Sequence, residues 1–294
     1  MNRPYTPGSP VVAGVDGSPL AERALDLAAD TAAMREAELH IVHAVSGAKL
    51  RRAGQDPEQA ETAARVPAVD LLAAYADRAR ERCPGLVVTT ELVTEGPVAG
   101  LVERSERAAL VVVGSRGMNR FASLVLGSVS QALVAHARCP VTVVRPTPDG
   151  GAAPEQGPVV VGVASDEDAA PVEFAFAEAE RRGAPVHAIR TWMAPQVYPG
   201  HMAVPPDEEA ERNLREAEEL EAALAAARKA YPEVPVATAV GLDEPEAALV
   251  AASEPAGLVV VGARRHRGVL ALPLGRVTSR VLHHAHCPVV VVPV

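Results

Sequence analysis

Aromatic residues are scarce in this chain of 294 residues, at 3% of the total, although 48% of the residues are hydrophobic. The cores must therefore be built from Val, Leu and Ala. Lysine is almost absent, with only Lys49 and Lys229, so nearly all positive charge is carried by arginine. The net charge of −9 and the pI of about 5.5 argue against non-specific nucleic-acid binding and against a basic membrane-surface patch.

Cysteine is also rare, and the sequence lacks the segments that direct a chain to a membrane. Cys83, Cys139 and Cys287 form no CxxC pair and cannot all be paired, which favours a reduced, intracellular compartment. The first ten residues have no apolar core of a signal peptide, and no run approaches the ~18 apolar residues of a membrane span. We therefore expect a cytoplasmic protein with neither a membrane nor a nucleic acid as partner.

The sequence contains two copies of one unit. VVAGVD at 11–16 matches VVVGVA at 159–164, and residues 111–144 match residues 259–292 without a gap. The offset is 148 positions in both cases, since 159 − 11 and 259 − 111 are equal. RPTPDGGAAPEQGP, at 145–158, is rich in Pro and Gly and is typical of a linker. We predict a first domain at 1–146, a linker at 147–158 and a second domain at 159–294.

Each copy alternates short Val-rich runs with Ala-, Leu- and Glu-rich stretches of helical period. The runs of the first copy are PVVAGV, ELHIVHAV, LVVTTELV, ALVVVG and PVTVVR, and helices fit at 18–35, 62–82, 97–107 and 128–137. The second copy repeats the pattern, and its longest helix, at 207–230, carries a mostly solvated charged face. Runs that are apolar on both faces indicate strands buried between helix layers. The pattern predicts an α/β fold of two tandem doubly wound units, each with a five-stranded parallel sheet.

Two polar turns follow strands whose carboxyl ends are expected at one edge of the first sheet. Gly14-Val15-Asp16-Gly17-Ser18-Pro19 follows the first strand, and there Ser18 suits an N-cap and Pro19 the first helical position. GSRGMNRFASLVLGS, at 114–128, follows the fourth strand. Ligands of open parallel sheets bind beyond the carboxyl ends of the strands, where the strand order reverses. These two turns therefore form the candidate binding site.

The second turn contains glycines at positions where a ligand could approach the backbone. Gly114 and Gly117 let the backbone turn tightly and approach a ligand without a Cβ in the way. Ser128, with Gln131 at capping-box spacing, opens the next helix, whose unpaired N–H groups bind phosphate without a lysine. The chain has no GxxxxGK[ST] motif and no GxGxxG after a strand. The alternative is that these glycines serve only the turns and that Ser128 is only a structural cap.

The spacing G-x2-G-x9-G-S, from Gly114 to Ser128, resembles the ATP-binding signature of the universal stress protein family. VVAGVDGSPLAERAL resembles the family's first strand and helix, and GSVSQALVAHARCPVTVV resembles its closing helix and strand. The resemblance covers nearly the whole chain. It implies a tandem member with Rossmann-like units of strand order 3-2-1-4-5, packed through their last strands as an intramolecular pseudo-dimer, and it leaves open an additional homodimer.

The resemblance also implies a cofactor, ATP with Mg²⁺, and a set of residues in the first domain that binds it. Gly14 and Asp16 would face the adenosine end of the nucleotide, and the backbone of Ala44 would meet the adenine. The loop 114–120 would wrap the ribose and phosphates, and the helix start at 127–129 would hold phosphate oxygens. The implied binding residues are Gly14, Asp16, Ala44, Gly114, Arg116, Gly117, Arg120, Gly127, Ser128 and Val129.

The second copy departs from this motif. Arg265 stands where the first copy has Gly117, and Arg276 where it has Ser128, although Gly262 and Gly275 are kept. Arg265 puts a side chain where the backbone would approach a ligand. Arg276 removes the expected cap and adds positive charge at a positive helix end. These changes predict a weak or empty second site, whereas the alternative is that the two arginines bind phosphate themselves.

Strand one of the second copy has changed as well. Ala164 replaces the aspartate, and SDED follows where the first copy has GSPL. Asp166, Glu167 and Asp168 are expected to add negative charge at the rim and to repel phosphate. Trp192, the only tryptophan, follows strand two near where an adenine would lie in this copy.

Histidine and cysteine cluster near the end of the chain, but the cluster is not interpreted as a metal site. His283, His284, His286 and Cys287 lie where a helix ends and the last strand begins. Adjacent positions point in different directions, and histidine is favourable at a helix C-terminus in its own right. We therefore predict no metal ligands in the chain.

The preferred function is that of an ATP-binding regulatory protein of the stress response, with the nucleotide held mainly by the first domain. No persuasive general base or nucleophile lies near the phosphates, because His40 and His43 are expected to pack on strand two, so no catalytic residue is predicted and at most slow ATP hydrolysis is expected. The alternative is an interaction scaffold without nucleotide, in which Asp16 only forms a turn and Arg116 and Arg120 only solvate a loop. An ATP-using enzyme would need an SGGxDS-type loop after strand one, and VDGSP is not such a loop.

Overall fold

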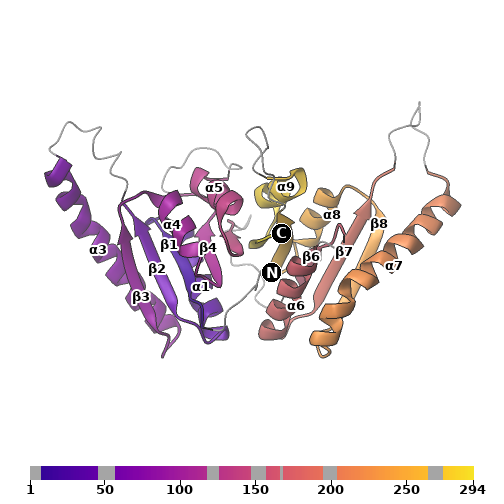
Figure 1. Cartoon of the computed structure of the whole chain (residues 1–294), viewed down its shortest axis with the longest axis horizontal. Coiled ribbons are helices and arrows are strands. Elements are labelled where there is room, and N and C mark those ends of the chain that lie inside the picture. The colour runs from indigo at the N-terminus through magenta and orange to yellow at the C-terminus, as the bar shows by residue number, and fades with distance from the viewer. Residues whose placement is uncertain are drawn as a thin grey trace. The chain divides into compact units, whose positions relative to one another are not determined.

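The computed structural model describes residues 8–45, 57–117, 126–146, 157–165, 168–194, 204–263 and 274–294. The chain divides after Pro146 into two compact units. Figure 1 shows that each unit is a sheet with helices on both faces. In each unit the strands alternate with helices along the chain, as the sequence pattern predicts.

The first unit holds five strands and four helices within its described residues. Its elements are β1 (Val11–Val15), α1 (Pro19–Met34), β2 (Leu39–Ala44), α3 (Pro57–Arg82), β3 (Val88–Val93), α4 (Pro97–Ser105), β4 (Leu110–Gly114), α5 (Ser128–His136) and β5 (Val141–Val144). The strand order is β3-β2-β1-β4-β5, which confirms the predicted order 3-2-1-4-5. All four neighbouring pairs are parallel.

The second unit repeats this topology. Its elements are β6 (Val159–Gly162), α6 (Ala169–Arg182), β7 (Val186–Trp192), α7 (Pro206–Ala230), β8 (Val236–Leu242), α8 (Pro245–Ala252), β9 (Leu258–Ala263), α9 (Arg276–His284) and β10 (Val289–Pro293). The strand order is β8-β7-β6-β9-β10. β6 to β10 take the same places in this sheet as β1 to β5 take in the first. The duplication of the amino-acid sequence is therefore a duplication of the fold.

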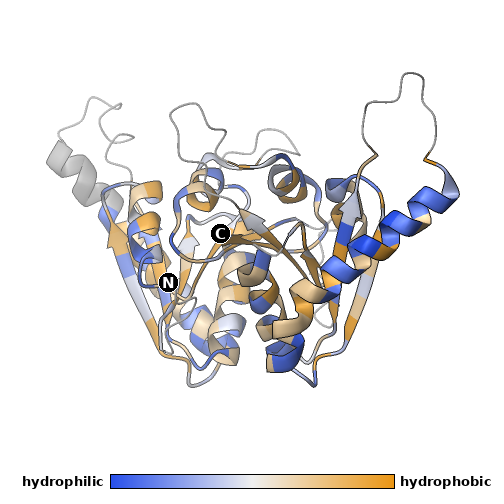
Figure 2. Cartoon of the chain, turned by 45° about the vertical axis from the view of Figure 1, so that its right-hand side comes forward, coloured by the Kyte–Doolittle hydropathy of each residue, from blue (hydrophilic) through white to orange (hydrophobic). Residues whose placement is uncertain are grey.

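Two helix layers cover each sheet. In the first unit, α1 and α3 pack together on one face, and α4 and α5 pack together on the other. In the second unit, α6 pairs with α7 and α8 with α9 in the same way. The central strands between these layers are buried and hydrophobic, whereas the edge strands β3 and β8 are partly exposed. α7 is hydrophilic along much of its length (Figure 2). Because both faces of the central strands are covered, the Val-rich runs read as continuous apolar stretches.

Valine, leucine and alanine fill the cores, as the shortage of aromatic residues requires. Leu25 of α1 and Leu39 and Ile41 of β2 are fully buried in the first unit. The second unit differs because Phe174 and Phe176 of α6 are buried in its core. α1 begins where the sequence predicts, since Ser18 accepts a hydrogen bond from the Ala21 N–H at 3.2 Å.

Candidate functional site

β1 and β4 lie side by side at the point where the strand order of the first unit reverses. β1 pairs in parallel with β2 on one side and with β4 on the other, so that Gly14 lies opposite both Val42 and Val113. The turn after β1 and the loop after β4 therefore leave the sheet at neighbouring points (Figure 1). This is the edge at which open α/β sheets bind ligands.

Asp16 and Gly117 meet at this edge. One Asp16 carboxylate oxygen, Oδ1, accepts a hydrogen bond from the Ser18 N–H at 3.0 Å, which forms a local turn. The other oxygen, Oδ2, would overlap a Cβ placed on Gly117. Any side chain at position 117 must therefore displace the half-buried Asp16 carboxylate or take the space in front of it. The structure brings these two residues of the implied site together.

Gly14 and Gly114 have a packing reason to be glycine. A Cβ on Gly14 would lie 2.9 Å from side-chain carbons of Leu101 and Val113. A Cβ on Gly114 would lie 3.1 Å from the backbone of Leu20, at the start of α1. The close packing of neighbouring groups on the strand ends thus gives both glycines a role that is independent of any ligand.

The start of α5 differs from the sequence prediction. Gly127, not Ser128, is the N-cap, and no side chain caps the described helix. The capping-box prediction is wrong because Ser128 is already the first helical residue, exposed to solvent, and the Gln131 N–H bonds the Gly127 carbonyl at 2.9 Å. The N–H groups of the first turn are left without a side-chain acceptor, as an anion-binding helix end requires. Val129 follows in the same turn and is half-buried.

Two hydrogen bonds hold this helix start against the end of β4 and the loop after it, and a third holds that loop against β5. The Gly127 N–H donates to the Ser115 carbonyl at 2.7 Å, and the Ser115 N–H donates to the Val144 carbonyl of β5 at 2.8 Å. The Ser130 hydroxyl donates to the Gly114 carbonyl at 2.7 Å. The sequence analysis did not predict a role for Ser130. Its counterpart in the repeat, Thr278, also has a hydroxyl group and makes the same bond to the Gly262 carbonyl at 3.1 Å. A hydroxyl residue kept at this position of both copies was a signal in the sequence.

Ser115 belongs to the loop 114–120 that the resemblance assigns to the ribose and phosphates, although it was not named individually. Ser115 is 1% exposed, and its hydroxyl has no hydrogen-bond partner within the part of the chain that the structure describes. Buried polar groups are nearly always hydrogen-bonded, so an unpaired one calls for an explanation. Its position between Gly114 and Arg116 puts this hydroxyl in the loop that is the candidate ligand site.

The remaining implied residues lie around the same edge. Ala44 is the last residue of β2, half-buried, and is paired in register with Val93. Arg116 is half-buried in the loop after β4. Arg120 lies outside the described residues.

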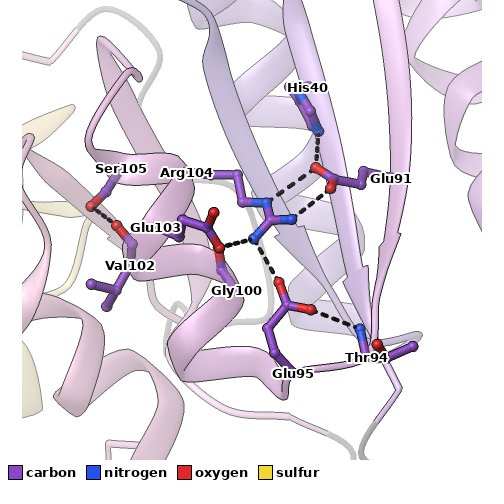
Figure 3. Close-up of polar contacts among 9 residues, drawn as sticks. All are labelled: His40, Glu91, Thr94, Glu95, Gly100, Val102, Glu103, Arg104 and Ser105. Atoms are coloured by element: carbon purple, nitrogen blue, oxygen red, sulfur yellow. Dashed lines mark hydrogen bonds and ion pairs between the residues drawn. The ribbon is translucent and has the colours of Figure 1, made fainter.

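The two histidines of β2 have structural hydrogen bonds, as their expected packing role requires. His43 donates from Nδ1 to the Val15 carbonyl at the end of β1, at 2.8 Å. His40 Nε2 lies 3.0 Å from Glu91 Oε2 (Figure 3). Near the turn after β1, burial, together with the Glu22 and Asp16 carboxylates, raises the pKa of Tyr75 to about 12.

An arginine-centred cluster fixes α4 to the sheet next to this edge. Arg104 of α4 donates to both carboxylate oxygens of Glu91 on β3, at 3.1 and 2.6 Å, and to Glu95 at 2.7 Å (Figure 3). Hydrogen bonds from Arg104 hold the pKa of Glu91 below its ordinary range. The cluster is explained by the anchoring of α4 and is not needed to form the site.

The second unit has different chemistry at its corresponding edge. Gly275 is the N-cap of α9, again with no side-chain cap from the described residues, so Arg276 does not replace a capping serine as the sequence suggested. The Arg276 Nε atom lies 3.4 Å from Glu246 Oε1. Asp168 was expected at the exposed rim but is 7% exposed. Arg265, Asp166 and Glu167 lie outside the described residues.

The histidine- and cysteine-rich end of the second unit has structural contacts of its own. His283 Nδ1 donates to the Ser279 carbonyl at 2.6 Å, and Cys287 is buried. Among the residues that the structure covers, no three His, Cys, Asp or Glu side chains are grouped to hold a metal ion. A search of the same residues for helices finds none that is both long and apolar enough to cross a membrane.

Comparison with known proteins identifies relatives along the whole chain. A model of the universal stress protein family matches residues 9–145 and again residues 157–293. Universal stress protein Rv2005c of Mycobacterium tuberculosis is 36% identical over 298 residues, covering 96% of each chain. Universal stress protein Rv2623 of the same organism is 33% identical over 299 residues, covering 96% of this chain and 95% of the relative.

Solved structures share the fold. A universal stress protein from Archaeoglobus fulgidus superimposes with a TM-score of 0.71 at 18% identity, covering 97% of this chain and 98% of that one. The duplicated family match, the two whole-length relatives and the shared fold agree with the motif in the loop after β4. The chain belongs to the universal stress protein family, as a tandem member with two copies of the family domain.

Proposed function

We propose that the first unit binds ATP, with Mg²⁺, and that the chain acts as a nucleotide-dependent regulator in the stress response. The observation that carries this proposal is the meeting of Gly117 with the Asp16 carboxylate beside the open start of α5. A loop without a side chain at its closest approach, a carboxylate and an uncapped helix end are then gathered at one strand edge. These are the three elements that a nucleoside polyphosphate needs.

Each element matches one part of the nucleotide. The Asp16 carboxylate accepts hydrogen bonds from the adenosine end, and the backbone of Ala44 lies at the end of the neighbouring strand for the adenine. The N–H groups at the start of α5 bind phosphate oxygens. The unpaired Ser115 hydroxyl supplies one more hydrogen bond in the loop between them. Arg116, with Arg120 from outside the described residues, adds positive charge.

The scaffold alternative is favoured by two of the glycines at the strand ends. Gly14 and Gly114 are explained by packing against Leu101, Val113 and Leu20, and a protein without a nucleotide would keep them. Packing does not explain Gly117, because the only group of the described residues that its Cβ would meet is the Asp16 carboxylate. Substitution of Gly117 therefore distinguishes the two functions.

The test is equilibrium dialysis of nucleotide-stripped protein against labelled ATP and Mg²⁺. The wild-type chain is expected to bind ATP, and Gly117→Arg, which copies the second unit, is expected to bind it at least about a hundredfold more weakly, a loss of about 2.8 kcal/mol. Because Gly117 is exposed, the thermal midpoint of the ligand-free variant stays close to that of the wild type.

Gly241→Arg is the matched control. A Cβ on Gly241 meets no atom of the described residues within 4 Å, and this glycine lies in β8, a strand of the second unit. The control should retain the wild-type affinity for ATP. Full affinity in Gly117→Arg, or none in the wild type, would favour the scaffold.

A further inference from the structure

The edge of the second sheet at which β6 and β9 end contains the carboxylate of Asp168. Asp168 Oδ2 accepts hydrogen bonds from the Ala164 N–H at 2.7 Å and from the Ser165 N–H at 3.0 Å. Its other oxygen, Oδ1, lies 3.0 Å from the position of a Cβ on Gly262, at the end of β9. Asp168 therefore lies between the ends of β6 and β9, where the strand order of this unit reverses.

The first unit has no carboxylate at the corresponding position. Leu20 corresponds to Asp168, since 20 + 148 = 168, and its backbone, rather than a charged group, packs against Gly114. The difference arises in the helices that follow. Pro19 opens α1 and corresponds to position 167, but α6 begins at Ala169, two residues later in the repeat. The later start leaves Asp168 ahead of the helix and free to turn back onto the strand end.

The positive charge of Arg276 at the start of α9 is paired with a carboxylate of the same unit. Arg276 lies 3.4 Å from Glu246, whose side chain is 7% exposed in the first turn of α8. Glu246 corresponds to Val98 and Arg276 to Ser128, since both pairs differ by 148, so the first unit has neither charge. A phosphate at this helix end would have to compete with a buried carboxylate for Arg276.

A third contact closes the edge on the side of β7. Arg190 donates to the Ala164 carbonyl at 2.8 Å and to Glu216 Oε2 at 2.6 Å. Trp192 donates from its indole N–H to Asn213 at 2.7 Å. Arg190 and Trp192 correspond to Val42 and Ala44, since 190 − 148 = 42 and 192 − 148 = 44. Where the first unit offers small apolar residues, the second has side chains bonded to α7.

We infer that the second unit is closed to nucleotides by its own side chains, with Asp168 as the internal anion that takes the two backbone N–H groups that follow β6. This inference rests on the proposed function. If the first unit binds ATP and the second is closed, the chain binds one nucleotide rather than two. Asp168 and Arg276 are then the residues that determine this difference between the units.

The test follows the amide resonances of Ala164 and Ser165 by heteronuclear NMR, with hydrogen exchange as a second readout. In the wild type we expect both amides to be protected and unshifted by saturating ATP or pyrophosphate. In Asp168→Ala we expect the two amide hydrogens to exchange about tenfold faster, because each loses roughly one hydrogen bond to a charged group. We also expect the resonances of both amides to shift when pyrophosphate is added. Asp168→Asn keeps one acceptor oxygen without the charge, so it retains the fold and should also respond to pyrophosphate.

Asp243→Ala is the control, because this exposed carboxylate also accepts a backbone N–H, that of Glu244 at 2.7 Å, after β8. It should leave both amides protected and unresponsive. Shifts of the wild-type amides with ATP, continued protection in Asp168→Ala, or no pyrophosphate response in Asp168→Ala and Asp168→Asn would each overturn the inference. The readout lies in the second unit and is repeated in Gly117→Arg, so the test stays decisive even if the first unit binds no ATP.

Discussion

Arg104 joins two strands and a helix through one guanidinium group. It bonds Glu91 on β3 with two N–H groups, and Glu91 in turn contacts His40 on β2 (Figure 3). The Arg104 side chain is 19% exposed and that of Glu91 36%, so solvent weakens the pair without abolishing it. A bidentate arginine–carboxylate contact of this kind fixes geometry as well as supplying energy.

The lowered pKa of Glu91 gives the first unit a defined response to acid. A carboxyl group with a lower pKa in the folded state stabilises the fold above its ordinary value of 4.5, and the stabilisation is lost as the pH falls through the lowered value. Glu91→Gln should therefore cost about 1 kcal/mol at pH 7 and flatten the fall of stability below about pH 4.5. Urea unfolding at a series of pH values measures both effects.

Glu103→Gln serves as the comparison for this prediction. Glu103 also accepts a hydrogen bond from Arg104, at 2.9 Å, but its side chain is 72% exposed. Its removal should change the stability little at any pH. If both variants keep the wild-type dependence on pH, the Arg104 cluster does not set the acid response.

At the scale of elements, a side-chain hydrogen bond to a strand carbonyl ties the helix that follows the fourth strand to the sheet in each unit. Ser130 bonds the Gly114 carbonyl and Thr278 bonds the Gly262 carbonyl. Ser130→Ala and Thr278→Ala should each cost about 1 kcal/mol of stability. Only Ser130→Ala should also weaken ATP binding, by about fivefold or 1 kcal/mol, because it loosens a helix start that must be preorganised.

Calorimetric titration with ATP and denaturant unfolding of both variants provide the measurement. The two substitutions remove the same kind of bond from matched positions, so each controls for the loss of stability in the other. An equal effect of both on ATP affinity would show that binding follows stability alone. An unchanged affinity in Ser130→Ala would remove the helix start from the site.

Local signals in the sequence were sufficient for most elements. The start of α1 follows from Ser18 and Pro19, since an N-cap and the residues it serves lie within one turn. The same reasoning was wrong for Ser128, because a long-range bond from the Gly127 N–H to the Ser115 carbonyl decides where α5 begins. Sequence spacing carries no information on that bond.

In the candidate site, too, the sequence predicted what depends on local signals and missed what depends on contacts between distant residues. Asp16 and Gly117 are far apart in the chain. The expected strand order put their two turns at one edge of the sheet, but only the structure shows that the Asp16 carboxylate lies against Gly117. The burial of Asp168 was not predicted, since it depends on where α6 begins relative to α1. The packing role of Gly14 was also missed, because Leu101 approaches it from another helix.

At the scale of the whole molecule, the two units share a topology but are proposed to differ in ligand. ATP at a hundred times its dissociation constant should stabilise the unit that binds it by about 2.7 kcal/mol. Hydrogen exchange measured by mass spectrometry should then slow in peptides from β1, β4 and α5, and stay unchanged in peptides from β6, β9 and α9. Equal protection in both halves would contradict a single binding unit.

Gly117→Arg is the reference for that experiment, because protection that persists in this variant does not come from the first site. The comparison needs no separated domains, since every peptide of one unit has a counterpart 148 positions away in the other. A slowing on addition of ATP that appears in one peptide and not in its counterpart therefore reports on the ligand rather than on the fold.

Trp192 gives the chain an optical label that belongs to one unit. It is the only tryptophan, it is half-buried, and it is held by Asn213 and by the Arg212 guanidinium 5.8 Å from its ring centre. Tryptophan-selective fluorescence therefore follows the melting of the second unit, whereas far-ultraviolet circular dichroism follows the helices of both. The gap between the two melting curves, recorded on the intact and unlabelled chain, measures how far the halves lose their structure independently.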